Sequence, residues 1–294
     1  MKENNKSILL ALVAVLSWST VATAFKVALM HLTHFEMLLV ASITSLIIFA
    51  IVLTVQCRWR EVFALSGRMW GYFALLGLLN PVAYYLVLFK AYDLLPAQIA
   101  QPVNYIWPVL LVVLLTVFTG QRIPPRQYIG MLVSLGGLVV ISVGGKQISS
   151  AGIPPVGLAL GVMSALLWAA YWMVNNRNKE RADATVACFM SFFFGSVYLG
   201  LGTLVVGVDL CTLPGILSGM YVGAFEMGVP FICFGLAIRK TTNPALINQL
   251  CYLSPFLSLF FVSTVLGEPI VSTTYIGLIL IVSGIVFNEY AVKK

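Results

Sequence analysis

Long apolar runs alternate with short polar breaks along almost the whole chain. Each run is close to the roughly 20 residues that a helix needs to cross the hydrocarbon core of a bilayer. The pattern therefore predicts ten membrane-spanning helices, which we place at residues 7–29, 35–55, 69–89, 96–118, 126–143, 156–176, 184–206, 216–238, 244–266 and 271–290.

The composition supports an all-α integral membrane protein and excludes several other classes. Charged residues make up 9% of the 294 positions and hydrophobic residues 60%, whereas soluble domains carry about 25% charged residues. A soluble fold of this size cannot bury so much apolar surface, so a soluble enzyme, a secreted disulfide scaffold and a disordered chain are excluded. Ten spans use about 210 positions, which leaves room only for short loops. Any function must therefore lie among the helices.

Basic residues gather on one side of this predicted topology. With the N-terminus in the cytoplasm, 14 of the 17 Lys and Arg residues fall on cytoplasmic segments, whereas Lys26, Lys90 and Lys146 fall outside. Cytoplasmic loops of membrane proteins carry such an excess. We therefore expect both termini to be cytoplasmic, which requires an even number of spans. The net charge of +7 then describes orientation and does not indicate a nucleic-acid partner.

The two halves of the sequence resemble each other at a shift of about 147 residues. Tyr128-Ile129-Gly130 reappears as Tyr275-Ile276-Gly277, and Gly137 as Gly284. Further pairs follow in the same order: Trp18 with Trp168, Pro81 with Pro230, Pro96-Ala97 with Pro244-Ala245, Asn104 to Pro108 with Cys251 to Pro255, and Gly120-Gln121-Arg122 with Gly267-Glu268-Pro269. The paired glycines predict close packing between helices.

An odd number of spans in each half gives the second half the opposite orientation in the membrane. We therefore expect two inverted five-helix repeats around a central cavity, formed by residues 1–147 and 148–294. Inverted repeats are typical of transporters that work by alternating access, with the substrate bound near the midplane between the copies.

Polar residues on the fourth and ninth spans form matching stripes. Each stripe occupies one helical face, and its members are Gln101, Asn104, Tyr105 and Pro108 on the fourth span and Asn248, Cys251, Tyr252 and Pro255 on the ninth. Such a stripe faces protein or water rather than lipid. It either lines a substrate cavity or forms hydrogen bonds between helices, and the mirrored placement favours the cavity. Pro108 and Pro255 are candidates for gating, with purely structural kinks as the alternative.

Aromatic residues supply a second group of candidates. Their rings can stack on an apolar substrate or contact an ammonium group through its positive charge; core packing and the interfacial aromatic belt are the alternatives. The cavity-lining candidates of this group are Trp18, Tyr84, Trp107, Trp168 and Trp172, and Asn80 is a further polar candidate on the third span.

Glu226 is the only acidic residue near the middle of a predicted span. An unpaired ionised carboxylate in hydrocarbon costs several kcal/mol, so we expect Glu226 to be neutral for part of the time or paired. It is a candidate for proton coupling or for capture of a substrate ammonium group. The alternative is a protonated acid that forms a hydrogen bond with a neighbouring helix. The five cysteines are scattered and no His/Cys ligand spacing occurs, so we expect no metal site and no cofactor.

The motifs Trp18-Ser19-Thr20, Asn104-Tyr105-Ile106-Trp107-Pro108, Gly120-Gln121-Arg122 and Trp168-Ala169-Ala170-Tyr171 carry a family resemblance. With them the chain resembles the drug/metabolite transporter superfamily, in particular its EamA-type ten-helix members of the YddG-type aromatic amino-acid exporter branch. The resemblance implies a basket of helices around a central cavity in the bacterial inner membrane. Glu226 departs from the pattern of that branch, and this departure concerns the identity of the substrate and not the assignment as a transporter.

These features favour a secondary transporter that exports amino acids, aromatic ones among them, or similar small metabolites. A passive facilitator or channel is the first alternative. An intramembrane enzyme is a weaker one, because the chain has no Asp-rich, HExxH or GxSxG motif, and the absence of a P-loop excludes ATP-driven transport by this chain alone. The expected partners are the small-molecule substrate, the lipid bilayer and, under the coupling hypothesis, protons; a monomer and a homodimer both stay open.

Overall fold

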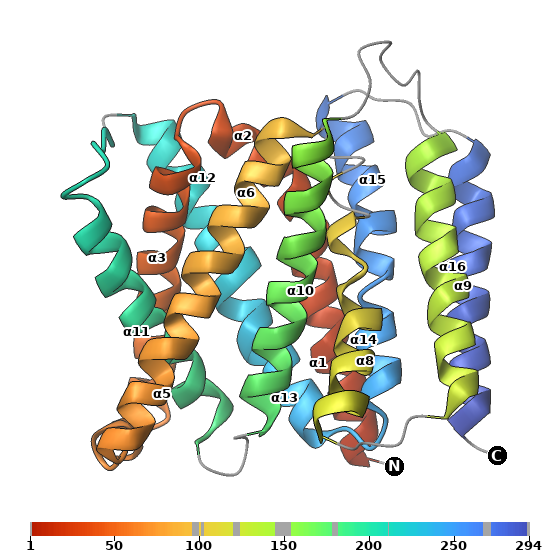
Figure 1. Cartoon of the computed structure of the whole chain (residues 1–294), viewed down its shortest axis with the longest axis horizontal. Helices are drawn as coiled ribbons and strands as arrows, with labels where there is room; N and C mark the ends of the chain where they lie inside the picture. The colour runs from red at the N-terminus through yellow and green to blue at the C-terminus, as the bar shows by residue number, and fades with distance from the viewer. Residues whose placement is uncertain are drawn as a thin grey trace.

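The computed structural model consists of helices that run between two ends of an elongated bundle (Figure 1). Every regular element in the part of the chain that it describes is helical. That part comprises residues 2–95, 100, 103–119, 124–144, 154–177, 182–210, 212–266 and 272–292.

The first half of the chain begins with a broken helix, continues through a long helix and a short surface helix, and ends with a helix that packs at the side of the bundle. Its elements are α1 Lys2–Ser19, α2 Val21–Leu29, α3 His34–Val55, α4 Trp59–Phe63, α5 Gly67–Gly77, the π-helix η1 Leu78–Ala83, α6 Tyr84–Leu94, α8 Trp107–Thr119 and α9 Pro125–Gly144.

The second half follows a similar order, but it begins with a single unbroken helix and has no counterpart of α4 among its described residues. Its elements are α10 Pro155–Arg177, α11 Ala184–Gly202, α12 Leu213–Val222, the π-helix η2 Gly223–Gly228, α13 Val229–Lys240, α14 Pro244–Leu250, α15 Leu253–Leu266 and α16 Ser272–Val292. A π-helix therefore interrupts the third long helix of each half.

Six helical stretches of the described residues are long and apolar enough to cross a membrane, and α8 and part of α16 form shorter apolar helices. Large apolar side chains such as Leu9, Ile51 and Ile279 lie exposed on the outside of the bundle. Such an exposed apolar surface is stable in contact with lipid, because its contact with water is unfavourable in free energy. The chain is thus a multi-pass membrane protein.

The second, fifth, sixth and tenth predicted spans agree with α3, α9, α10 and α16 to within two residues at each end. The seventh prediction is wrong at its C-terminal end, because α11 stops at Gly202 and Leu204 and Val205 lie exposed in a turn. Gly200 and Gly202 are poor helix formers, and they end the helix although the apolar run continues. Of the predicted fourth span, the structure describes residue 100 and residues 103–118.

The first and ninth predicted spans are each divided in two. The break in the first lies at Thr20, and the break in the ninth lies at Cys251 and Tyr252. The third long helix is interrupted at Asn80, whose backbone is extended (φ −147°, ψ 122°) because Pro81 follows it. Pro81 has no N–H group to continue the helical hydrogen bonds. These breaks lie within the bundle and turn backbone and side-chain polar groups towards its interior.

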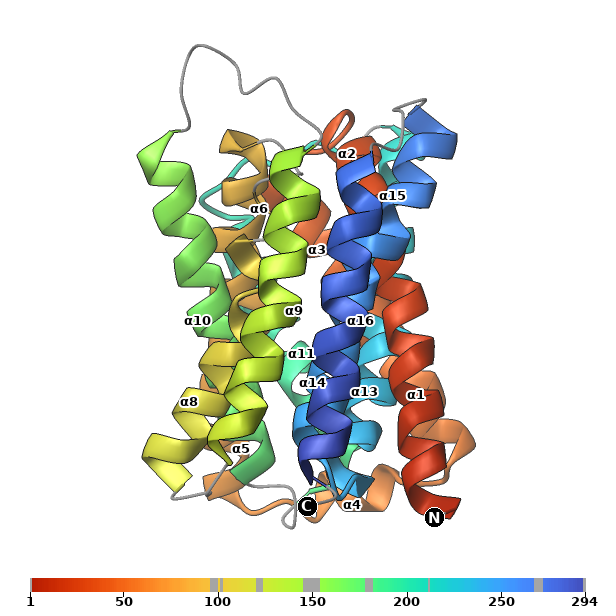
Figure 2. The ribbon, with the colours of Figure 1, turned by 90° about the vertical axis from the view of Figure 1, so that its right-hand side faces the viewer.

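Helix packing in one half is repeated with the halves exchanged. On one side α10 packs against α6 and α8, and on the other α1 packs against α13 and α15. Likewise α11 contacts α5, and α3 contacts α12. Helices α9 and α16 pack against each other at the side of the bundle (Figures 1 and 2), and the start of α1 and the end of α16 lie at the same end of the molecule.

The predicted close packing of paired glycines is confirmed between α9 and α16. A Cβ atom on Gly137 would lie 2.5 Å from the carbonyl oxygen of Gly277, and one on Gly284 would collide with the carbonyl oxygen of Gly130. The hydroxyl of Ser134, on the same face, donates a hydrogen bond to the carbonyl oxygen of Ile281 (3.1 Å). The two helices are therefore in backbone contact.

We expect Gly284→Ala to destabilise the protein by about 1–3 kcal/mol, the usual cost of overpacking a tight contact. The added methyl group would force α9 and α16 apart, because the atoms it meets are backbone atoms of α9 and the Ser134 side chain. Thermal unfolding of the purified protein in detergent measures the effect as a lower midpoint. Gly136→Ala is the matched control, since its Cβ atom would meet nothing within 4 Å; an equal loss in both variants would contradict the expectation.

Candidate functional site

A cavity lies inside the bundle between the two halves of the chain. Its free volume is about 40 Å³ in this conformation, whereas pockets for small-molecule ligands commonly measure about 300–1,000 Å³. The residues that line it are Trp18, Val21, Ala22, Phe25, Tyr84, Leu88, Tyr92, Asn104, Tyr105, Trp107, Trp168 and Glu226. Helices α2 and α6, which contribute to the lining, lie towards the end of the bundle away from the termini (Figure 1).

Two helix faces form much of the wall. Trp18, Val21, Ala22 and Phe25 follow the spacing i, i+3, i+4 and i+7 across the break between α1 and α2, and Tyr84, Leu88 and Tyr92 lie one turn apart on α6. Residues with this spacing share one face of a helix. The rings of Phe25 and Tyr92 meet edge to face, with centroids 5.6 Å apart. This pair closes the part of the cavity that lies between α2 and α6.

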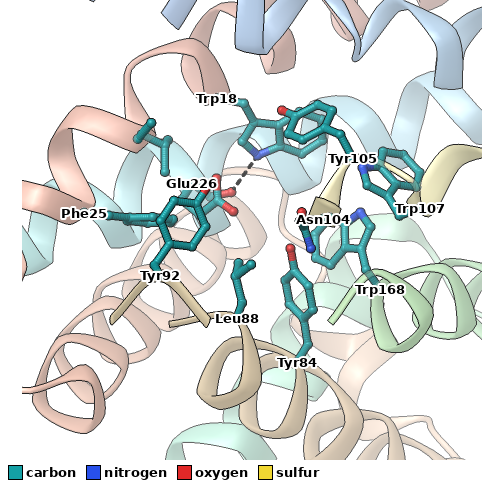
Figure 3. A pocket seen from close by; sticks show the side chains of 12 residues that line it. Trp18, Phe25, Tyr84, Leu88, Tyr92, Asn104, Tyr105, Trp107, Trp168 and Glu226 are labelled. Carbon is teal, nitrogen blue, oxygen red and sulfur yellow. Dashed lines mark hydrogen bonds between the residues drawn. The ribbon is translucent and has the colours of Figure 1, made fainter. Parts of the chain in front are cut away.

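Glu226 provides the carboxylate of the cavity and is held in place from two helices. It lies in η2 and is 8% exposed. The hydroxyl of Tyr85 donates a hydrogen bond to Oε1 of Glu226 (3.1 Å). The indole Nε1–H of Trp18 donates to the backbone carbonyl oxygen of Glu226 (3.0 Å), which the π-helical segment leaves accessible. Figure 3 shows the Glu226 side chain between Trp18 and the Phe25–Tyr92 pair.

Trp168 is the centre of an aromatic cluster at the wall of the cavity. Its ring lies 4.5 Å from that of Tyr84 with an interplanar angle of 31°, 6.1 Å from that of Trp107 and 6.5 Å from that of Trp18. On its far side Trp168 contacts Phe231, at 5.2 Å. Rings from α1, α6, α8, α10 and α13 thus form one contiguous cluster, in which most pairs meet edge to face, and this cluster makes one wall of the cavity aromatic.

Asn104 and Tyr105 lie just before α8, Asn104 in a helical segment and Tyr105 in the turn that follows it. The amide Nδ2 of Asn104 donates a hydrogen bond to Oγ of Ser164 on α10 (2.9 Å), which fixes its orientation beside the cavity. Tyr105 lies in a turn, and Trp107 is the first residue of α8. Pro108 is therefore in the first turn of α8, where a missing N–H group is tolerated. Pro255 occupies the same place in α15, and gating by these two prolines stays a prediction.

The structure brings together seven of the residues that the sequence singled out: Trp18, Tyr84, Asn104, Tyr105, Trp107, Trp168 and Glu226 all line the cavity. Asn80, Trp172, Asn248 and Tyr252 are buried but are not part of its lining. Asn80 lies beside Tyr171, Trp172 packs against Phe234, and Tyr252 packs with Leu138 and Ile281. Gln101 lies outside the described residues. Contact of any of these residues with substrate stays a prediction.

Five lining residues were not among the predicted site residues: Val21, Ala22, Phe25, Leu88 and Tyr92. The spacing from Trp18 to Phe25 and from Tyr84 to Tyr92 is the signal that could have identified most of them. It is hard to recognise because every face of these helices is rich in apolar residues, so that periodicity does not distinguish a cavity face from a lipid face.

Comparison with known proteins assigns the chain to a family. The profile of the EamA-like transporter family matches twice, over residues 5–143 and 155–290. One relative is an uncharacterised transporter of Clostridium kluyveri, which is 27% identical over 179 residues, or 59% of this chain and 57% of that protein. Another is the aromatic amino acid exporter YddG of Salmonella typhimurium, 22% identical over 65% of this chain and 67% of that protein.

A solved crystal structure shares the fold. It superposes with a TM-score of 0.79 at 22% sequence identity and covers 96% of both chains. The two family matches together span most of the sequence, and they agree with the multi-pass helical bundle and with the resemblance of its motifs. The chain therefore belongs to the EamA-like transporter family.

Proposed function

We propose that the chain is a secondary transporter that exports amino acids, aromatic ones among them, or similar small metabolites by alternating access. The observation that carries this proposal is a cavity between the two halves of the bundle that joins aromatic faces to a single carboxylate. Aromatic faces bind flat apolar groups and the carboxylate binds an ammonium group. One relative is named as an aromatic amino acid exporter, and this supports the same class of substrate.

The proposed architecture is a pair of inverted five-helix repeats, with ten spans and both termini in the cytoplasm of a bacterial cell, in the inner membrane. Three observations support it. The family profile matches each half once; helix contacts recur with the halves exchanged; and α1 begins at the end of the bundle where α16 ends (Figure 2). The bias of Lys and Arg in the sequence favours the cytoplasm for that end.

In the proposed mechanism, separate hydrogen bonds between helices act as the closures of the two ends of the bundle. Towards the termini, the hydroxyl of Tyr72 on α5 donates to the carbonyl oxygen of Val174 on α10 (3.0 Å), and Nη1 of Arg239 on α13 donates to the carbonyl oxygen of Ala182 (2.6 Å). Towards the other end, the hydroxyl of Tyr221 on α12 donates to Oγ1 of Thr20 (2.8 Å). In the proposed cycle these two closures open in turn, and opening enlarges a cavity that is too small for an amino acid as it stands.

Glu226 is the proposed coupling residue. Of the residues that line the cavity in the described part of the chain, it is the only one with a carboxyl group. A buried carboxyl group without a cation nearby is more stable as the neutral acid. It would therefore take up a proton when the cavity is empty and release it when a positively charged substrate group arrives. This exchange would tie the movement of substrate to the movement of protons.

Counterflow in proteoliposomes tests the transport function. Vesicles that contain the purified protein are loaded with an unlabelled aromatic amino acid, and a trace of the same labelled compound is added outside, with and without a proton gradient. We expect saturable, transient accumulation of label, compared with protein-free vesicles. Linear, non-saturable flux would assign a channel instead, and the absence of transport across a panel of aromatic and aliphatic amino acids would overturn the exporter proposal.

A further inference from the structure

The described residues that line the cavity include a negatively charged group but no positively charged one. Among its twelve lining residues, Glu226 is acidic, and none is Lys, Arg or His. The remaining polar groups are the Asn104 amide, the hydroxyls of three tyrosines and the N–H groups of three tryptophans. The described wall therefore offers a full negative charge to a ligand but no full positive charge.

The nearest basic side chains on the lining helices belong to a different cluster. Lys90 forms an ion pair with Asp93 on the same helix (2.7 Å), and Lys26 also acts on Asp93. Both lysines are partly accessible, which places their charge near the surface. Arg239 is occupied with Ala182 and Asn175 near the opposite end of the bundle. Lys90 and Arg239 have other partners, and none of these three cations is among the residues that line the cavity.

The groups around the Glu226 carboxyl group suit an ammonium ion. The phenolic rings of Tyr84, Tyr85 and Tyr92 and the indole ring of Trp18 come from two helices on either side of it. The negative face of an aromatic ring attracts a cation, by about 0.5–2 kcal/mol depending on how well water is excluded. A carboxylate from the ligand would instead share the cavity with the Glu226 carboxylate, and no lining residue in the described part of the chain would offer it a full positive charge.

We propose that the cavity selects an organic monocation, in which an amino or alkylammonium group is attached to an aromatic or apolar body. A carboxylate on the same body weakens binding. The inference rests on the proposed function, because the cavity is taken as the transport site. Within the proposed class of amino acids and similar small metabolites, it selects the amines that lack a carboxylate. On binding, the ammonium group pairs with the Glu226 carboxylate, and the proton of the neutral carboxyl group passes to solvent, so that total charge is conserved.

Three ligands with the same ring and side-chain length separate the contributions of the two charges. They are 2-phenylethylamine, phenylalanine and 3-phenylpropionate, which are a cation, a zwitterion and an anion at neutral pH. Binding to the purified full-length chain in lipid nanodiscs is followed by the fluorescence of the cavity tryptophans and by calorimetry. We expect the amine to bind at least about 10-fold more tightly than phenylalanine, and phenylpropionate to bind most weakly.

Two variants of Glu226 test whether the carboxylate is responsible. Glu226→Gln should reduce the preference for the amine over phenylalanine to within about 2-fold, whereas Glu226→Asp, which keeps the charge, should retain it. Amine affinity of the native protein should also rise with pH, because the proton and the ammonium group compete for one carboxylate. In Glu226→Gln that rise should be absent.

The outcomes also separate this inference from the transport proposal. Amine-selective binding without counterflow of any tested compound would support the selectivity and overturn the transporter. Counterflow of phenylalanine together with equal or tighter binding of phenylalanine would support the transporter and overturn the selectivity. The selectivity is likewise overturned if none of the three ligands binds, or if Glu226→Gln keeps the native order of affinities.

Discussion

Replacing Glu226 with glutamine is expected to abolish the dependence of transport on the proton gradient and to lower gradient-driven transport at least about 10-fold. The glutamine keeps the size of the side chain and can still accept a hydrogen bond from Tyr85, but it cannot take up or release a proton. Counterflow needs no net proton movement, so exchange of labelled for unlabelled substrate should persist in the variant, at the higher substrate concentrations that loss of the partner of the ammonium group requires. Measuring both modes in the same proteoliposomes separates coupling from substrate binding.

Asp93→Asn is the matched control for this experiment. Asp93 follows the lining residue Tyr92 on α6, but its carboxylate points to an exposed ion pair with Lys90. Removing this charge also changes the electrostatic field near the cavity, without changing a group inside it. We expect the control to keep a wild-type response to the proton gradient. A wild-type rate and pH dependence in Glu226→Gln, or an equal loss in Asp93→Asn, would contradict proton coupling through Glu226.

The sequence was sufficient to predict most of the helices because one physical requirement dominates them. Residues in lipid must be apolar and their backbone groups must bond within the helix, so long apolar runs give helices of matching length. The breaks were less predictable. Thr20 interrupts the first apolar run without any charge or proline, and the π-helical segment at residues 223–228 depends on how η2 packs against α3. The positions of these helix breaks therefore depend on packing between distant segments, which the hydropathy of the sequence does not reveal.

In the candidate site, too, the residue types could be predicted from the sequence, whereas the neighbours of each residue depend on distant segments. Trp18, Trp107 and Trp168 were candidates as large aromatic residues, Trp18 and Trp168 in comparable places of the two halves, and the structure puts all three at the cavity. The mirrored stripe on the ninth span does not behave in the same way, because Tyr252 packs with Leu138 and Ile281 instead. Similar sequence in two halves does not give equal environments in one conformation.

Tyr72 and Tyr221 are expected to control opposite sides of the transport cycle. They lie 149 residues apart, the spacing that also separates Pro81 from Pro230. Each hydroxyl links the third long helix of one half to the first long helix of the other. Tyr72 donates to the carbonyl oxygen of Val174, and Tyr221 donates to Oγ1 of Thr20. Helix α5 begins at the lower end of the bundle and α12 at the upper end in Figure 1, so the two bonds lie on helices that enter the bundle from opposite ends.

Removing one hydroxyl should weaken only the closure to which it belongs. A hydrogen bond of this kind contributes about 1 kcal/mol, which corresponds to roughly a 5-fold change in an equilibrium constant. We expect Tyr72→Phe to favour opening towards the end that holds the termini, and Tyr221→Phe to favour opening towards the other end. Because the shifts have opposite signs, the ratio of accessibility from the two sides should differ by roughly 30-fold between the variants.

A cysteine at the cavity reports this ratio. Ala22→Cys, placed in a chain whose five native cysteines are replaced by serine, puts a thiol on the cavity wall. A membrane-impermeant maleimide is then applied to right-side-out and to inverted vesicles, and labelling rates are compared. Tyr198→Phe is the matched control, because its hydroxyl also donates to a backbone carbonyl oxygen, that of Ala74 (3.1 Å), but between α11 and α5. Two results would show that the two bonds do not act as alternating closures. One is an equal shift of the labelling ratio in all three variants, and the other is a shift of this ratio in the same direction in Tyr72→Phe and Tyr221→Phe. Either result would indicate a general loosening of the bundle, which changes access from both sides together.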